Sequence, residues 1–285
     1  MNTLLFVGVH PDEDWYTQKC ALFIQKFLSE DHRVLTIDLN RYIPYEKGMR
    51  FRIYNGSIYD LNRVFGPIKN DMYSQIKLAY EITHKVPYDT NNILDYWVAA
   101  FKENNIDIQE ILAGSQDIKN GFFGYTNNEI KEFLYTVIRV IKRIIVNEFD
   151  SQEPLRIVDI HAGLGEAAEI SCFYKYTIGN NMEHYFDKVN HFSKVVTNTL
   201  LSQSYRTIEL IALEIGIHST QWHFQNVLRQ VIDNIRQLSY SDNTRNHKKR
   251  YDELDSDLDN RYEWLRKFEE KDYSNCLKLL TLLKD

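Results

Sequence analysis

The chain has 285 residues, a formal net charge of -6, 44% hydrophobic and 26% charged residues, and 3 cysteines. This composition fits a soluble globular protein with a sizeable core, and it gives no general footprint for nucleic-acid binding. The few, widely spaced cysteines favour a reducing compartment, and no apolar stretch approaches the ~20 residues that span a membrane, so we expect a cytoplasmic protein without a membrane partner.

The N-terminal segment predicts a strand, a helix and a second strand. An apolar run over residues 4–7 ends in the abrupt polar turn GVHPDE. Residues 15–28 carry apolar side chains at helical spacing, and residues 33–39 are apolar and β-branched. Strand, helix and strand in this order indicate a parallel sheet with a right-handed crossover.

The middle of the chain is less regular. Residues 40–67 are rich in Tyr, Arg, Gly and Pro and show little periodicity, so we expect a functional loop there. Helices are predicted over residues 71–83 and 92–103, with a second irregular piece over 113–125. The capping box TNNE at residues 126–129 predicts a helix that runs to about residue 147.

Two further strands are predicted in the second half. One covers residues 155–160, ends at His161 and is followed by a glycine-containing turn over 162–165; the other covers 208–215 and carries Glu214 near its end. A helix over 224–238 and a charged segment with a short apolar helix complete the chain. We therefore predict an α/β fold with a central mixed, largely parallel sheet flanked by helices over residues 1–240, and a charged helical appendage over 241–285 packed on it.

Three predicted strands end in side chains that can bind a metal. His10 and Glu13 lie three residues apart, so one tight turn can aim both at one point, while His161 and Glu214 end two other strands. Ligands of open α/β sheets bind at the carboxyl ends of the strands. Two imidazoles and a carboxylate are a common catalytic zinc set, so we expect one zinc per chain on His10, Glu13 and His161, with Glu214 as general base. The simpler alternatives are a hydrogen-bonded core histidine at 161 and an ion-paired carboxylate at 214.

Two aspartates lie beside these residues. Asp12 leaves the turn in a different direction from Glu13, so we do not expect it to be a ligand. Asp159 lies two residues before His161 and therefore points to the same side of the strand, where it could support the histidine.

Four motifs, GVHPDE, YDLNRVF, IVDIHAGLG and ALEIG, resemble in this order those of the zinc-carboxypeptidase superfamily. That superfamily includes the succinylglutamate desuccinylases and aspartoacylases, and the likeness is greatest to an uncharacterised bacterial carboxypeptidase-like branch. It spans about residues 4–235. The matching stretches are residues 10–13, 44–52, 60–65, 114–124, 159–165 and 214–216.

The resemblance implies a zinc-dependent hydrolase that cleaves an amide bond in a small peptide or N-acyl amino acid with a free carboxylate. It also implies a role for each matching residue: His10, Glu13 and His161 hold zinc, Glu214 and Arg63 are catalytic, and Asn62 and Arg63 bind the substrate carboxylate with help from Arg52 or Arg50. A guanidinium fork suits such bidentate recognition. Pro11, Ala162 and Ile217 depart from the pattern of the family, which puts the choice of substrate in doubt.

Two other interpretations stay open. The opening LLFVGVHPDED also resembles the de-N-acetylases of the GlcNAc type, in which Asp12 would act as the base and Glu13 as a ligand. That family accounts for neither DLNRVF nor ALEIG. The third possibility is a non-catalytic binding module on the same fold. The sequence decides neither the substrate nor the oligomeric state.

Overall fold

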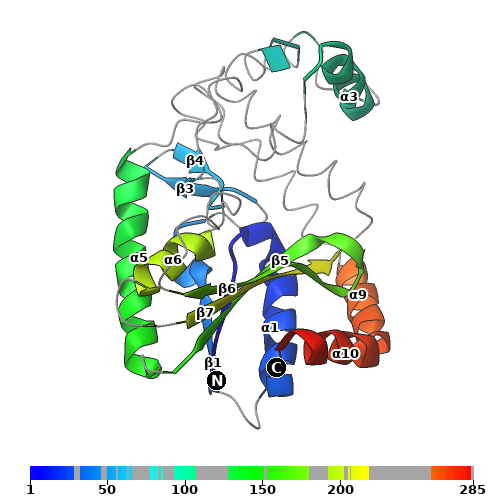
Figure 1. Cartoon of the computed structure of the whole chain (residues 1–285). Helices are drawn as coiled ribbons and strands as arrows, with labels where there is room; N and C mark the ends of the chain where they lie inside the picture. Colours follow the sequence, from blue (N-terminus) through cyan, green and yellow to red (C-terminus); the bar gives the residue numbers. More distant parts are fainter. Residues whose placement is uncertain are drawn as a thin grey trace.

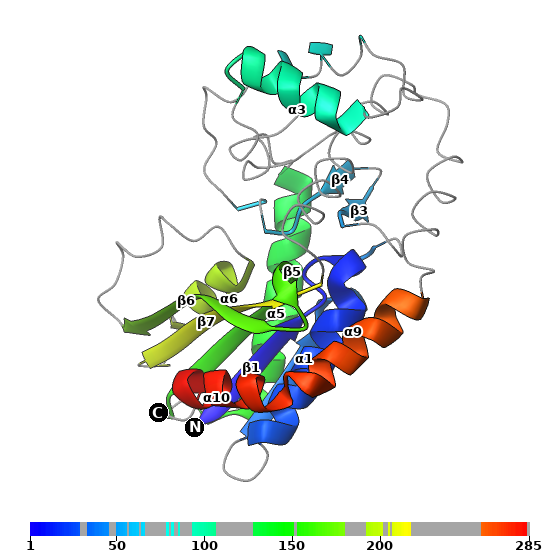
Figure 2. The same cartoon turned by 90° about the vertical axis from the view of Figure 1, so that its right-hand side faces the viewer.

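The computed structural model describes residues 1–28, 33–45, 50–55, 57–62, 64–65, 78–79, 81–82, 85, 93–106, 128–150, 153–179, 192–201, 205, 207–217 and 258–283. Within these ranges the fold is α/β, with a central sheet between two layers of helices (Figures 1 and 2). The strand order in the sheet is β2-β1-β5-β7-β6. The strands are β1 (Asn2–Val7), β2 (Arg33–Asp38), β5 (Leu155–Ala167), β6 (Ile170–Gly179) and β7 (Thr207–Gly216).

The sheet is mostly parallel. β1 pairs in parallel with β2 and β5, β5 pairs in parallel with β7, and only the edge strand β6 runs antiparallel to its neighbour. The carboxyl ends of β1, β5 and β7 therefore meet at one edge. This arrangement confirms the predicted fold class of a largely parallel sheet flanked by helices.

Each face of the sheet carries its own layer of helices and its own core. Helices α5 (Asn128–Glu148) and α6 (Phe192–Leu201) cover one face, and α1 (Asp14–Leu28), α9 (Leu258–Glu270) and α10 (Asp272–Leu283) cover the other (Figure 2). All six residues of β1 are buried because both of its faces are covered, which accounts for its unbroken apolar run. The remaining elements are α3 (Ile93–Glu103), the short hairpin β3 (Arg52–Tyr54) and β4 (Ser57–Tyr59), and the 3-10 turns η1 (Pro11–Glu13) and η2 (Leu39–Arg41).

One predicted turn is wrong. Residues 162–167 do not turn after His161 but continue β5 to Ala167, with a shift of register against β7 between Gly163 and Ala167. Gly163 and Gly165 have φ values of 152° and 107°, which glycine adopts at little cost. The glycines thus mark a bulge in a long strand. Closely spaced glycines are found in turns as well as in bulges, which is why the sequence suggested a turn.

Several elements were not predicted, and some predictions fall outside the described residues. The hairpin β3–β4 lies within the segment expected to be an irregular loop, and neither β6 nor α6 was expected. The helix predicted over 224–238, most of that over 71–83, the irregular piece over 113–125 and the capping residue Thr126 lie outside the described ranges. Among the helices that the structure describes, none is long and apolar enough to cross a membrane.

The C-terminal helices belong to the core on one face of the sheet. Trp264, Leu279 and Leu283 pack in one buried cluster with residues of β1, β5 and β7. The end of α10 is also held by polar contacts, because Lys175 on β6 donates to the Leu282 carbonyl at 2.9 Å and Arg156 on β5 donates to the Leu283 carbonyl.

Truncation of a core residue of α10 should therefore destabilise the whole domain. Leu279→Ala removes a side chain with 0% exposure and should lower the free energy of unfolding by about 2–5 kcal/mol. The matched control Leu277→Ala, on the same helix but 46% exposed, should cost less than about 0.5 kcal/mol. Equilibrium urea unfolding measures both, and equal small effects would mean that α10 does not pack on the sheet.

Candidate metal centre

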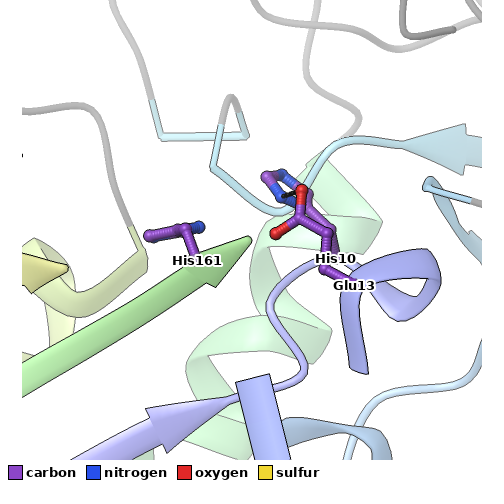
Figure 3. Close-up of side chains that lie close together, drawn as sticks. All are labelled: His10, Glu13 and His161. Carbon is purple, nitrogen blue, oxygen red and sulfur yellow. Dashed lines mark hydrogen bonds and ion pairs between the residues drawn. The ribbon is translucent and has the colours of Figure 1, made fainter. Parts of the chain in front are cut away.

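Three buried side chains converge at the carboxyl edge of the sheet. His10 follows β1, Glu13 lies in η1, and His161 lies on β5 (Figure 3). One ligand atom from each lies within 4.8 Å of the others, and this is the one such group among the described residues. His10 and Glu13 come from one turn and His161 from a segment distant in sequence, and the parallel pairing of β1 with β5 brings them together.

The turn after β1 is shaped by its backbone. Gly8 has φ +69°, and a Cβ there would lie 2.7 Å from Nδ2 of Asn40, so both conformation and space favour glycine. Pro11 opens η1, a position that suits its fixed φ, and the Glu13 N–H donates to the His10 carbonyl at 3.1 Å. This tight turn places the His10 and Glu13 side chains side by side.

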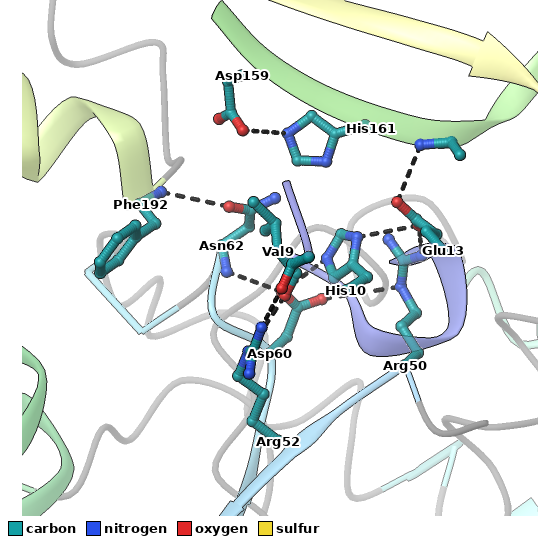
Figure 4. Close-up of polar contacts among 12 residues, drawn as sticks. Val9, His10, Glu13, Arg50, Arg52, Asp60, Asn62, Asp159, His161 and Phe192 are labelled. Atoms are coloured by element: carbon teal, nitrogen blue, oxygen red, sulfur yellow. Dashed lines mark hydrogen bonds and ion pairs between the residues drawn. The ribbon is translucent and has the colours of Figure 1, made fainter. Parts of the chain in front are cut away.

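Glu13 has three polar partners within the cluster. Its Oε1 lies 3.0 Å from His10 Nδ1 and accepts from Arg50 Nη1 at 2.5 Å, and its Oε2 accepts from the Ala162 backbone N–H at 3.0 Å (Figure 4). Burial alone would raise the pKa of this carboxyl, but the charges of His10 and Arg50 hold it well below its usual range. Glu13 is therefore ionised at neutral pH.

Each histidine is backed by a carboxylate of its own. His10 Nε2 lies 3.2 Å from Asp60 Oδ1, and His161 Nε2 lies 3.2 Å from Asp159 Oδ1 (Figure 4). Asp159 thus lies beside His161, as its strand parity predicts. Histidines that bind metals usually give their second nitrogen to a carboxylate or carbonyl in this way, which orients the ring and leaves the other nitrogen for the metal.

This donor set fits zinc. Two imidazoles, each with Nε2 directed to an aspartate and Nδ1 as its second nitrogen, and one ionised carboxylate supply the three protein ligands of a catalytic zinc site. The ligands are buried, with His10 and Glu13 each 3% exposed and His161 6% exposed, so water competes weakly for them. The geometry thus provides a group that could hold a metal ion.

The other expected site residues differ in where they lie. Glu214 is half-buried on β7, paired in register with His161, and its charge contributes to raising the pKa of that histidine. Asn62 and Arg50 also lie at the cluster: Asn62 is 2% exposed, and Arg50 lies against Glu13. Arg63 lies outside the described residues.

Arg52 lies in a different environment from Arg50. Its side chain is fully buried, and its guanidinium donates to the backbone carbonyls of Gly8, Val9 (3.3 Å) and Ile43 (2.8 Å) and to Asn40 Oδ1 (2.9 Å). Burial lowers the pKa of Arg52 to about 10. These contacts link the turn over residues 8–13 to the residues after β2, so in this structure the guanidinium supports that turn.

Sequence reasoning missed Asp60 and the Ala162 N–H. Asp60 belongs to the motif YDLNRVF, but only the Asn and Arg of that motif were given roles. The available signal was that Asp60 directly follows a short strand, as His10 follows β1. A backbone N–H carries no signal in the sequence at all.

Comparison of the chain with protein-family models, with curated proteins and with solved structures found no match. The function of this chain must therefore be inferred from its own residues and their geometry.

Metal binding should depend on His161. Purified wild-type protein loaded with zinc should hold about one ion per chain, and His161→Ala should lose it, because two remaining ligands rarely retain a catalytic metal. Cys172→Ala removes an exposed thiol and should keep the zinc, which controls for adventitious binding. Elemental analysis after gel filtration measures all three, and full occupancy in His161→Ala would refute the ligand assignment.

Zinc affinity should also rise with pH. Burial would lower the pKa of His161, but the charge and hydrogen bond of Asp159 raise it to about 9, so the ring is protonated at neutral pH. Zinc needs the neutral ring and must displace that proton, so below pH 9 the affinity should fall by up to about tenfold per pH unit for each proton released. Calorimetric titrations in buffers of different ionisation enthalpy count the protons, and an affinity that stays flat from pH 6 to 9 would contradict this.

Proposed function

We propose that this chain is a zinc-dependent hydrolase with a zinc-carboxypeptidase-like fold that cleaves an amide bond in a small peptide or N-acyl amino acid carrying a free carboxylate. The observation that carries the proposal is the buried group of His10, Glu13 and His161, in which each imidazole is backed by an aspartate. Zinc bound there would polarise the scissile carbonyl and make water a better nucleophile at neutral pH.

Glu214 is the proposed general base. It lies opposite His161 in the register of β5 and β7, which puts both side chains on the same face of the sheet. It is not a member of the group that could hold the metal, and it is half-buried, so solvent reaches its side chain. A carboxylate in this position can take a proton from water and return one to the leaving amine.

Arg50, Asn62 and Arg63 are the proposed recognition residues for the substrate carboxylate. Arg50 lies within the cluster, and its contacts with Glu13 and Asp60 hold its guanidinium beside the proposed metal position. Asn62 accepts from the Phe192 N–H through Oδ1 at 3.2 Å, which leaves its amide NH2 group as the donor for a ligand. The assignment of Arg63 rests on the motif alone. Arg52 drops from this set because its donors are already bonded to the protein.

The two rival functions predict different mutational results. A de-N-acetylase would use Asp12 as its base, whereas a carboxypeptidase-like hydrolase would use Glu214. A binding module would bind zinc and substrate without turnover. Asp12→Ala and Glu214→Gln therefore separate the three possibilities.

Loss of Glu214 should remove activity without removing the metal. With zinc-loaded protein screened against N-acyl amino acids and short peptides, Glu214→Gln should lower kcat by about 10²–10⁴-fold, because the base acts in the transition state, while zinc content stays at the wild-type level. Asp12→Ala should change kcat far less. Steady-state kinetics and elemental analysis on the same preparations provide the measurement.

A substrate and its carboxamide analogue serve as the control for carboxylate recognition. Wild-type protein should prefer the carboxylate, and Arg63→Ala should lose that preference mainly through a raised KM. Loss of kcat in Asp12→Ala with normal kcat in Glu214→Gln would instead support the de-N-acetylase, and absence of turnover on every substrate would leave the binding module.

A further inference from the structure

We infer that Ser193, at the start of α6, is a positioning residue of the metal centre: its hydroxyl holds Asp159, and Asp159 holds His161. This inference rests on the proposed metal site but not on the proposed reaction. Ser193 lies in none of the motifs that carry the resemblance, and α6 itself was not expected from the sequence.

The contacts form a continuous chain of one hydrogen bond and one ion pair. Ser193 Oγ donates to Asp159 Oδ2 at 2.6 Å, and the other oxygen of the same carboxylate lies 3.2 Å from His161 Nε2. Ser193 is 1% exposed and Asp159 is 0% exposed. Water therefore has little access to the carboxylate.

The short bond from Ser193 has the length of a charge-assisted O–H···O⁻ bond, which is stronger than a neutral one. A carboxylate that is held through one oxygen alone can rotate about its last side-chain bond. With both oxygens engaged, its plane is fixed, and so is the direction from which it faces the His161 ring. Since metal affinity depends on how well the partner of a ligating histidine is oriented, Ser193 should affect a metal that it does not touch.

The first turn of α6 is itself firmly anchored. The residue before the serine, Phe192, donates its N–H to Asn62 Oδ1 at 3.2 Å (Figure 4), and its ring packs edge-on against Phe6 of β1 with centroids 6.3 Å apart. Adjacent residues of one helix thus orient Asn62, proposed to bind the substrate carboxylate, and Asp159, which orients the metal histidine. The start of α6 therefore links the proposed substrate-binding residue Asn62 to Asp159 at the proposed metal site.

A purely structural role for Ser193 would be to satisfy a buried carboxylate, and the test must separate this from positioning. We compare Ser193→Ala and Ser193→Thr with Thr197→Val. Thr197 lies one turn further along α6, is also fully buried, and donates its hydroxyl to the Ser193 carbonyl at 2.7 Å, so Thr197→Val removes a matched hydroxyl that does not touch Asp159. Thermal melting of the zinc-free proteins reports the structural cost of each change.

The readouts are Zn²⁺ affinity, from competition with a chromogenic chelator, and the visible absorption spectrum of the Co²⁺-loaded protein, which reports ligand geometry. Ser193→Ala should bind Zn²⁺ about tenfold more weakly and alter the Co²⁺ spectrum. Ser193→Thr should restore both, and Thr197→Val should leave both unchanged even where its melting temperature falls as far.

A double-mutant cycle tests whether Ser193 acts through Asp159. In the Asp159→Ala background, Ser193→Ala should cost no further Zn²⁺ affinity, because the group that the serine holds is gone. Additive losses, a normal affinity in Ser193→Ala, or an equal loss in Thr197→Val would each overturn the inference. Wild-type protein that shows the predicted Zn²⁺ pattern but hydrolyses nothing would refute the proposed function and leave this inference standing, whereas wild-type protein that binds no Zn²⁺ would overturn both.

Discussion

The site depends on the interactions of the Glu13 carboxylate. A buried carboxylate is costly unless it is paired and hydrogen-bonded, and Glu13 obtains its partners from three segments: His10 in its own turn, Arg50 before β3, and the N–H of Ala162 on β5. The last bond can form because the pairing of β1 with β5 ends at Asp159, so β1 no longer flanks the next part of β5. The Glu13 carboxylate accepts from the β5 backbone where β1 no longer pairs with it, and this contact holds the turn over residues 8–13 close to His161.

The charges around the cluster favour protonated histidines in the metal-free protein. Arg50 lies against Glu13 and 4.0 Å from Asp60, and Asp159 and Glu214 act on His161. The pKa values of both histidines are raised by neighbouring carboxylates, despite the opposing effect of burial. A metal that binds the neutral imidazole of His161 would therefore release a proton from the site.

The sequence predicted that His10, Glu13 and His161 come together, because strand ends carry a strong signal. An imidazole or carboxylate directly after a buried apolar run, as at His10 and His161, is costly to bury unless it is paired or binds a metal, and parallel pairing then brings such residues together. The groups that hold them were harder to predict. Asp60 and Ser193 reach the cluster from a two-stranded hairpin and from a short helix, and both elements are too short for their periodicity to be detected. The glycines after His161 form a bulge, but the same glycine spacing is also typical of a turn. Arg50 and Arg52 lie two residues apart, and nothing in the sequence distinguishes their roles. Only their contacts in the structure do so.

Two residues that differ from the zinc-carboxypeptidase pattern lie where the backbone makes the contact. Pro11, where that pattern has a glycine, is at the first position of η1, where its ring fixes a φ that the turn already needs and no N–H is required. Ala162 lies where that pattern has a threonine, but the group that reaches Glu13 is its backbone N–H, and its methyl group is buried in the core on the opposite face of the sheet. Neither change removes a donor or an acceptor from the metal cluster. If these substitutions alter function, they do so through the space around the substrate and leave the ligands of the metal as they are.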